Sequence, residues 1–303
     1  MNAKLLLNSI WALKHLVLNA DNALKKNSLD ELGPGWLKQI ICNGTEEFRE
    51  HGPANTSLGM QTSNAAGMQV DLLNAVDSST QNQEEDSEGD VRMSDTEPTR
   101  PKSISRLSSS PSISPNADDL AIQKEGLELI RNLLCGEKAA EMIDYLFCEL
   151  GQDKFFELLA SKLRTRAHHN AYNRRASSKP STSAVRHMQA HAEIVASVTY
   201  ILVHIAAGNP RHRQQLIAQT ELLRLVVPLF SHHSPAVRVC CAWLVINLTW
   251  VDNQHDQDNC KARARELGKL GVLERLKILE QDTDLDCRER AKTGTHQLGL
   301  LLR

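Results

Sequence analysis

The clearest pattern of apolar and polar positions lies between Thr220 and Trp250, where two stretches with helical spacing flank a polar turn. Steps of three and four residues place apolar side chains on one face of a helix. The turn ends at Pro235, which suits the first position of a helix. The stretches predict two helices, with apolar positions Leu222, Leu223, Val226, Val227 and Phe230 in the first and Val237, Cys241, Val245 and Leu248 in the second.

The second of these patterns recurs along the chain. Downstream, residues 222–248 align without a gap onto residues 272–298, at an offset of 50. Upstream, the matching positions are Ile194, Val198, Leu202 and Ile205, then Ile122, Gly126, Ile130 and Leu133, then Leu5, Ser9, Leu13 and Leu16. One position is small or compact in every copy, which allows a close helix crossing: Ser9, Gly126, Val198, Cys241 and Ala291. Five copies of one helical pattern predict a repeat protein.

A second face of these predicted helices carries large polar or aromatic side chains. Residues four apart lie on one helix face. In four copies a prominent residue is followed four places later by an amide or an imidazole: Trp11 and His15, Glu128 and Asn132, Tyr200 and His204, and Trp243 and Asn247, with Trp250 one turn further on. The helices are therefore expected to pack on one side and to contact something else on the other.

The spacing between copies fits a known repeat length once polar insertions are set aside. Tyr200 and Trp243 are 43 residues apart, within the roughly 40–47 residues of armadillo and HEAT units. The two longer gaps each contain a polar segment. The predicted fold is an all-α, armadillo/HEAT-like α-solenoid, with repeat helices at 1–42, an insertion at 43–117, repeat helices at 118–163, a basic loop at 164–188 and C-terminal repeats at 189–303.

The insertion at 43–117 cannot bury enough apolar surface to offset the cost of ordering the chain, so we expect disorder there. It contains an acidic run at 84–90 and a basic, Ser-rich stretch at 100–115. Ser110 and Ser114 each precede a proline and are candidate phosphorylation sites. Added phosphate would change the charge of the insertion without disturbing the core. A tolerated insertion without regulation is the alternative.

The second insertion, 164–188, is basic and carries no acidic residue. Such a run binds an acidic partner, nucleic-acid phosphate or an import receptor, or remains a solvated loop. Ser177 follows two arginines, as in sites of basophilic kinases. The one metal-like cluster here lacks a cysteine pair or a glutamate at a supporting spacing, so no metal site is expected from His168, His169, His187 and His191.

Composition argues against several functional classes. The formal net charge of −2 over 303 residues gives no general attraction to nucleic acid or membranes. No apolar run approaches the roughly 18 residues of a membrane-spanning helix. The seven cysteines stand mostly at apolar positions of the pattern, as reduced packing thiols do. The sequence has no Gly-rich phosphate loop, no nucleophile motif and no paired carboxylates in an apolar context, so no enzyme activity, cofactor or small-molecule substrate is expected.

The two ends of the chain differ. Residues 1–18 predict the third helix of a repeat without its first two helices, so the face of Leu5, Leu13 and Leu16 is expected to lack part of its packing. We expect either a covering partner or a longer protein of which this chain is a C-terminal portion. A single notched helix is expected over Leu29–Cys42. The last repeat replaces apolar residues with charged ones, as a terminal cap does.

Two segments carry a more specific resemblance. YILVHIAAGNPRHRQQLIAQTELLRLVVPLF (200–230) and VRVCCAWLVINLT (237–249) resemble armadillo repeats in their order of third helix, Gly-Asn-Pro break, first helix and second helix. Within that superfamily, residues 6–26, 126–147 and 190–300 are similar to the armadillo-repeat subunit of the GID/CTLH ubiquitin ligase, the family called armadillo-repeat-containing protein eight in animals. The resemblance implies a non-catalytic adaptor, cytoplasmic and nuclear, that links a RING-type core to a substrate receptor for protein degradation.

The resemblance also implies where a partner binds. Third helices of stacked armadillo repeats line a concave wall, where an Asn amide pairs with an extended backbone and a Trp covers its side chains. Helix packing or capping is the competing role for each candidate. The candidate partner-binding residues are Trp11, His15, Asn132, Tyr200, His204, Trp243, Asn247 and Trp250.

Two other functions stay open. A transport adaptor of the karyopherin-alpha type reads Lys/Arg signals with such a ladder, but it needs acidic residues beside the groove and an unbroken array. Arg131, Arg211 and Arg238 argue against it. A junctional or cytoskeletal armadillo scaffold is the third candidate. The leading prediction expects other ubiquitin-ligase subunits as partners, including the receptor and the RING-type core, and no nucleic acid, membrane or small molecule.

Overall fold

The computed structural model describes residues 3–42, 117–173 and 182–303, apart from the side chains of Pro34 and of 165–190. The described residues form α-helices and short 3-10 helices, with no strand among them. In chain order the elements are α1 (Ala3–Val17), α2 (Asn22–Leu32), α3 (Pro34–Cys42), α4 (Ala117–Leu133), α5 (Ala139–Leu150), α6 (Gln152–Asn173), α7 (Thr182–Ala207), α8 (Pro210–Ile217), α9 (Thr220–Val226), η1 (Val227–Ser231), α10 (Pro235–Leu248), η2 (Gln254–Asp256), α11 (Gln257–Lys269), α12 (Val272–Leu279) and α13 (Leu285–Leu301).

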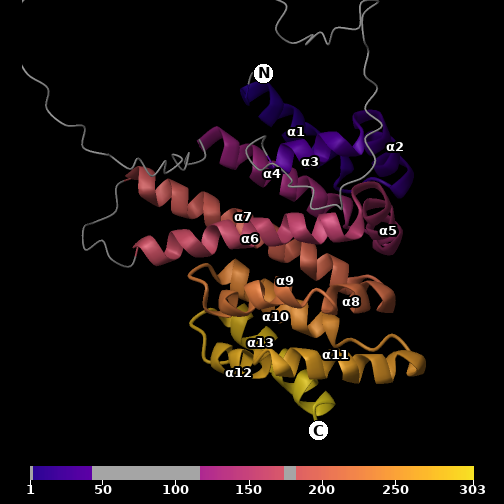
Figure 1. Cartoon of the computed structure of the whole chain (residues 1–303), viewed down its shortest axis with the longest axis vertical. Helices are drawn as coiled ribbons and strands as arrows, with labels where there is room; N and C mark the ends of the chain where they lie inside the picture. The colour runs from indigo at the N-terminus through magenta and orange to yellow at the C-terminus, as the bar shows by residue number, and fades with distance from the viewer. Residues whose placement is uncertain (1–2, 43–116, 174–181) are drawn as a thin grey trace, which may run out of the picture. The chain divides into compact units, whose positions relative to one another are not determined.

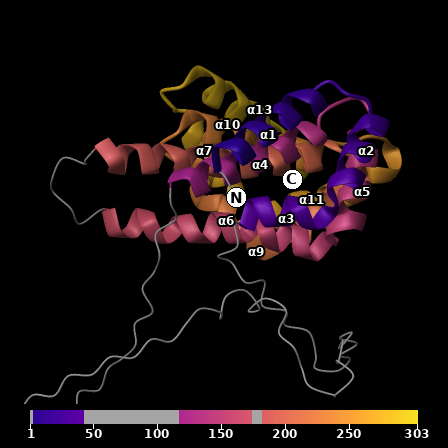
Figure 2. The same ribbon diagram turned by 90° about the horizontal axis from the view of Figure 1, so that it is seen from above.

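Five helices carry the repeated sequence pattern and pack one against the next in chain order: α1, α4, α7, α10 and α13, here called the inner helices. Figure 1 shows the elements following one another from the indigo N-terminal helices to the yellow C-terminal ones. Seen from above in Figure 2, the inner helices lie along one side, and α3, α6 and α9 lie along the opposite side. The five predicted copies of the pattern therefore lie on the five inner helices, each stacked on the next.

Each inner helix after α1 completes a unit of three helices, so the units are α2–α4, α5–α7, α8–α10 and α11–α13. In the third unit, η1 continues the second helix, because Pro228 lacks the amide hydrogen that an α-helix needs. Stacked units of three helices are the armadillo arrangement. The predicted fold class is confirmed: the described part of the chain is an all-α, armadillo/HEAT-like solenoid.

The apolar stripes of α4, α7 and α10 lie in the core between units. On α10 all four stripe residues are at most 2% exposed, and on α7 all four are fully buried. On α1, Leu5 and Leu16 are 67% and 57% exposed, because no described helix covers that side. Burying a leucine side chain stabilises a fold by about 1.5–3 kcal/mol. The incomplete packing that the sequence predicted for this face is therefore observed in the described residues.

Gly126 on α4 lets α3 approach its inner helix closely. A Cβ atom built at Gly126 would lie 2.6 Å from Cγ2 of Ile40, closer than carbon atoms approach in folded proteins. Ile40 is buried and β-branched, so its side chain has little freedom to move away. The small residue in this copy of the pattern serves the close helix crossing that the sequence predicted.

Two predicted boundaries differ from the structure. The helix expected over Leu29–Cys42 is two helices, because Gly33 adopts a φ of 76° and its N–H closes α2 on the carbonyl of Leu29. Pro34 then starts α3. The basic loop expected at 164–188 is helical at both ends, since α6 extends to Asn173 and α7 begins at Thr182. The added turns are rich in alanine and arginine, which favour helices, and the loop prediction had considered only their charge.

Several predictions fall outside the described residues. Residues 43–116 and 174–181 are not described, and the candidate phosphorylation sites Ser110, Ser114 and Ser177 belong to them. The side chains of His168, His169 and His187 are also outside the described part. The phosphorylation sites and the histidine cluster therefore remain as the sequence analysis stated them.

Buried arginines close the C-terminal ends of two inner helices, a feature that the sequence pattern did not reveal. Arg263 on α11 donates from Nε to the carbonyl of Leu248 at 2.7 Å and from a terminal nitrogen to that of Trp250 at 3.1 Å. Both carboxylate oxygens of Asp256 accept from the same guanidinium at 2.9 Å, which holds the pKa of Asp256 below its usual value. Arg213 on α8 donates to two carbonyls at the end of α7 in the same way. These bonds satisfy carbonyls that a helix end leaves open.

Candidate protein-binding site

Two rows of side chains cross the inner helices, and they correspond to the two members of the predicted pairs. Neighbouring members of a row come from neighbouring inner helices. Gln297 joins the second row because it stands 50 positions after Asn247 in the gapless alignment. The aromatic row holds Trp11, Glu128, Tyr200 and Trp243, and the amide row holds His15, Asn132, His204, Asn247 and Gln297.

The amide row ties inner helices to one another. Three of its amide side chains donate a hydrogen bond to a main-chain carbonyl of the preceding inner helix. In each case the acceptor is the residue immediately before that helix's own member of the row, so the contact is one repeated device. The bonds are Asn132 Nδ2 to Lys14 O at 3.0 Å, Asn247 Nδ2 to Val203 O at 3.2 Å and Gln297 Nε2 to Ile246 O at 3.0 Å.

The junction between α4 and α7 uses a histidine and a thiol instead of an amide. Nε2 of His204 lies 3.6 Å from Sγ of Cys135, and this thiol donates to the carbonyl oxygen of Arg131 at 3.2 Å. Arg131 immediately precedes Asn132, so its carbonyl is equivalent to the three amide acceptors. Burial lowers the pKa of His204, and the Arg131 guanidinium lowers it further. The imidazole is therefore neutral at pH 7.

The first two members of the aromatic row have different surroundings. Trp11 is 55% exposed, and its ring centre lies 4.4 Å from that of His15. Glu128 forms an ion pair with Lys14 of α1 at 2.7 Å, and Glu125 pairs with the same ammonium group. The two carboxylates are only 18% and 14% exposed. These acids are therefore committed to the contact between α1 and α4.

Arginines lie over the other two rings of the aromatic row. The guanidinium of Arg290, from α13, lies 4.4 Å from the centre of the Trp243 ring. The guanidinium of Arg131, from α4, lies 5.6 Å from the centre of the Tyr200 ring. A cation within about 6 Å of a ring centre is attracted to the π face, by about 0.5–1 kcal/mol at exposed sites. Both rings are half-buried, so these cations cover part of the surface that remains.

Trp250 follows the last turn of α10 and is 56% exposed. Its N–H donates to the carbonyl of Asn247 at 3.2 Å, and its own carbonyl accepts from Arg263. The backbone is thus held while the indole faces solvent. Large aromatic side chains on a held backbone are frequent anchors in protein interfaces, since they bury much area and lose little freedom.

Comparison with curated proteins finds a distant relative. Schizosaccharomyces pombe GID complex subunit 5 is 22% identical to the chain over 225 residues. The match covers 58% of this chain and 25% of the relative, so the chain spans about a quarter of the relative's length. No protein-family model matches the chain. The armadillo-type stack and the similarity to a complex subunit together support a protein-interaction scaffold.

Engineered proteins are similar in structure. A designed armadillo repeat protein is 17% identical, with a TM-score of 0.42 over 61% of this chain and 60% of its own. An engineered protein is 18% identical, with a TM-score of 0.42 over 60% and 59%. A designed armadillo repeat protein in complex with the peptide (KR)4 is 18% identical, with a TM-score of 0.41 over 59% and 58%. The fold assignment for this chain depends on its own helices and their packing.

The predicted partner-binding residues differ in how exposed they are, and therefore in how accessible they are to a partner. Asn132 is only 3% exposed and its amide is bonded to α1, so the competing packing role is observed for it. Asn247 is partly exposed and has the same packing role toward α7. Partner binding by the other residues remains a prediction. Of these, Trp11, His15 and Trp250 are exposed, and Tyr200, His204 and Trp243 are partly exposed.

Three contributors to this surface were missed in the sequence: Arg131 and Arg290 as partners of rings, and Gln297 as a member of the amide row. A signal existed for Gln297, because the 50-residue offset aligns it with Asn247. For the arginines no sequence signal existed. Arg131 reaches a ring on the following inner helix, and Arg290 reaches one on the preceding helix. No single spacing describes both contacts.

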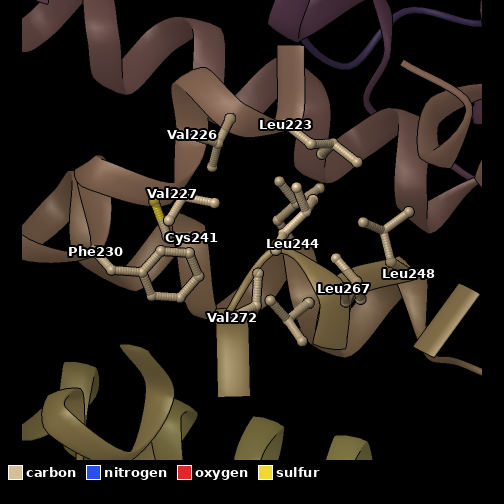
Figure 3. A pocket seen from close by; sticks show the side chains of 11 residues that line it. Leu223, Val226, Val227, Phe230, Cys241, Leu244, Leu248, Leu267 and Val272 are labelled. Atoms are coloured by element: carbon tan, nitrogen blue, oxygen red, sulfur yellow. The ribbon is translucent and has the colours of Figure 1, made fainter. Parts of the chain in front are cut away.

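The stack also contains an apolar pocket between the third and fourth units (Figure 3). Side chains of α9, η1, α10, α11 and α12 line it, among them Leu223, Phe230, Leu244, Leu267 and Val272. The lining has no charged, amide or hydroxyl side chain that would orient a ligand. The pocket is therefore a gap in the packing between units.

Two other kinds of site were sought in the described part of the chain. Within these residues, His, Cys, Asp and Glu side chains form no group of three or more that could hold a metal ion. No described helix combines the length and the apolar character that crossing a membrane requires.

Proposed function

We propose that the chain is a non-catalytic scaffold subunit of a multi-subunit ubiquitin ligase of the GID type, active in the cytoplasm and nucleus. In this role it binds a substrate-receptor subunit along its inner helices and connects it to the RING-type core for protein degradation. The similarity to GID complex subunit 5 supports the choice of complex.

The observation that carries the proposal is a difference between side chains of the inner helices: amides are bonded within the fold, whereas aromatic rings are exposed. The amide side chains of the amide row are committed to contacts between helices, with Asn132 buried and bonded to α1. Trp11 and Trp250, by contrast, are 55% and 56% exposed on backbones that the fold holds in place. Exposed aromatic side chains beside a rigid helix stack are the residues that contribute most to protein interfaces. The receptor is therefore assigned to Trp11, His15, Tyr200, Trp243 and Trp250, with the partly exposed edge of His204 beside them.

Affinity capture from cells with the tagged full chain tests this function. The wild-type chain is expected to co-purify RING-domain ubiquitin-ligase subunits together with a receptor subunit. Trp243→Leu is expected to lose the receptor and to keep the RING-domain subunits. Ile278→Ala is the matched control, because Ile278 is 65% exposed and lies on α12, which is not an inner helix.

Other outcomes of the same capture contradict the proposal. Recovery of cargo with importin beta indicates a transport adaptor, and recovery of cadherin or actin-binding proteins indicates a junctional scaffold. Equal loss of all partners in Trp243→Leu and in Ile278→Ala would show that the inner helices have no special part in binding. Circular dichroism on each variant separates lost binding from lost helices.

A further inference from the structure

Tyr200 and Trp243 lie on adjacent inner helices, and each ring has an arginine of this chain over it. Arg131 approaches Tyr200 from α4, and Arg290 approaches Trp243 from α13. Four consecutive inner helices therefore present a strip with an arginine at each end and two rings between them, here called the arginine–aromatic strip. The chemistry of this strip limits the kind of guest that the proposed site accepts.

The acidic residues near the strip are already paired. Glu125 and Glu128 bind Lys14, and Glu193 lies 3.1 Å from Lys124. Among the described residues no carboxylate pairs with Arg131, whose side-chain hydrogen bond goes to Oδ1 of Asn132 at 3.4 Å. A guest therefore meets positive charge that the fold has not neutralised at this end of the strip.

The other end is similar. Nε of Arg290 lies 3.2 Å from Oδ1 of Asp286, and no other carboxylate of the described residues pairs with this guanidinium. The five N–H groups of a guanidinium can hold one carboxylate and still offer a fork to a second. The side chain is 38% exposed, so a guest can reach it.

The same arrangement disfavours basic guests. A ladder that reads Lys or Arg leaves the π face of its tryptophans open to the cation of the guest. Here Arg290 already occupies that face of Trp243 at 4.4 Å, and Arg131 lies over Tyr200. A basic guest must displace a cation of the protein and also approach like charge. His204, which lies beside the strip, has its pKa lowered by burial and then by Arg131, so it adds no positive charge at neutral pH.

We propose that the arginine–aromatic strip binds an acidic linear segment of the partner, with carboxylates at Arg131 and Arg290 and apolar or aromatic side chains against Tyr200 and Trp243. Packed helices have axes about 8–10 Å apart, and an extended chain advances about 3.3 Å per residue. The residues that contact the two rings are thus expected about three positions apart, with the acidic residues outside them. This inference depends on the proposed function, because it specifies the guest of the same site.

Selection from a library of random linear peptides tests the charge preference directly. The full chain is the bait, and peptides that also bind the Trp243→Leu chain are discarded, so that only ligands of the strip are counted. We expect Asp and Glu to be enriched over Lys and Arg in the selected peptides. Binding of a selected peptide is expected to weaken with added salt, because exposed charge pairs are screened.

Variants of the two arginines complete the test. Arg131→Gln with Arg290→Gln is expected to weaken a selected acidic peptide about tenfold or more, since each change removes a charge-assisted contact. Lysine at both positions keeps the charge without the planar fork and is expected to restore part of the binding. Arg275→Gln is the matched control, because Arg275 is an exposed arginine on α12. Circular dichroism again shows whether each variant is folded.

The possible failures are distinguishable. Enrichment of basic peptides, or equal affinity of an acidic peptide for the wild type and the glutamine variant, overturns the charge assignment and leaves the proposed function standing. Failure to select any peptide whose binding depends on Trp243 contradicts the proposed site itself.

Discussion

The amide row and the aromatic row lie on the same inner helices, four residues apart, yet the structure uses them in opposite ways. Asn132, Asn247 and Gln297 hold one helix to the next through a main-chain carbonyl. Tyr200 and Trp243 instead have an arginine over their rings and remain partly exposed. An asparagine on an inner helix is therefore not by itself a sign of peptide binding. Its role depends on whether its amide already has an acceptor in the fold.

The largest effect on the free energy of unfolding is expected at the C-terminal end of the inner helix α10, where Arg263 is buried. Arg263→Met removes a buried guanidinium and leaves Asp256, which is 3% exposed, with only the more distant guanidinium of Arg213 at 3.7 Å. Breaking a buried ion pair by removing one member costs about 3–5 kcal/mol. Urea unfolding is expected to show a loss of this size. A loss below about 1 kcal/mol would mean that the carbonyls of Leu248 and Trp250 do not depend on this side chain.

A smaller loss is expected from the amide row. Asn132→Leu keeps the branched shape of the side chain but removes the donor to Lys14 O, and a buried polar group left without a partner costs about 1–3 kcal/mol. Asn247→Leu is expected to cost less, because Asn247 is partly exposed and water can reach the site. Urea unfolding of both variants measures the difference. Equal stability of Asn132→Leu and wild type would remove the structural role of the row.

The histidine junction predicts a dependence on pH. Because burial and Arg131 lower the pKa of His204 from 6.5, the unfolded chain takes up a proton there more readily than the folded chain. Stability is therefore expected to fall as the pH drops below about 6.5. His204→Gln gives this junction a glutamine, the residue type that Gln297 provides on α13. The variant is expected to show a smaller fall in stability. His212 and His232 also have pKa values lowered by burial, that of His232 to about 4, so part of the fall remains in the variant. Parallel pH dependence in both proteins would contradict the assignment to His204.

The smallest effect is expected from the exposed end of the aromatic row. Trp11→Ala removes a ring that is 55% exposed and contacts His15, so stability is expected to change by no more than about 0.5 kcal/mol. A thermal unfolding curve checks this. A large drop would show that Trp11 belongs to the core of the stack and not to its accessible surface.

The sequence predicted the stack well, because its signal is local. Steps of three and four residues predicted the buried stripes of α7 and α10, and the 43-residue spacing between Tyr200 and Trp243 predicted their repetition. The spacing of the predicted i, i+4 pairs did not reveal which polar side chains already form hydrogen bonds within the fold. Asn132 and Asn247 were assigned to a guest because of their residue type, whereas their acceptors lie on another helix, 118 and 44 residues away in sequence. Contacts between helices, such as those of Arg131 and Arg263, depend on packing that no spacing within one helix encodes.

The most direct test of the account measures two quantities on two variants of α10: the affinity for a peptide selected on the wild-type chain, and the free energy of unfolding in urea. Trp243→Leu is predicted to weaken the peptide about tenfold or more and to change stability by about 1 kcal/mol or less. Asn247→Leu is predicted to lower stability by about 1 kcal/mol and to leave the affinity of the folded protein nearly unchanged. The reverse result, with Asn247 deciding affinity and Trp243 deciding stability, would contradict the separation of the two rows.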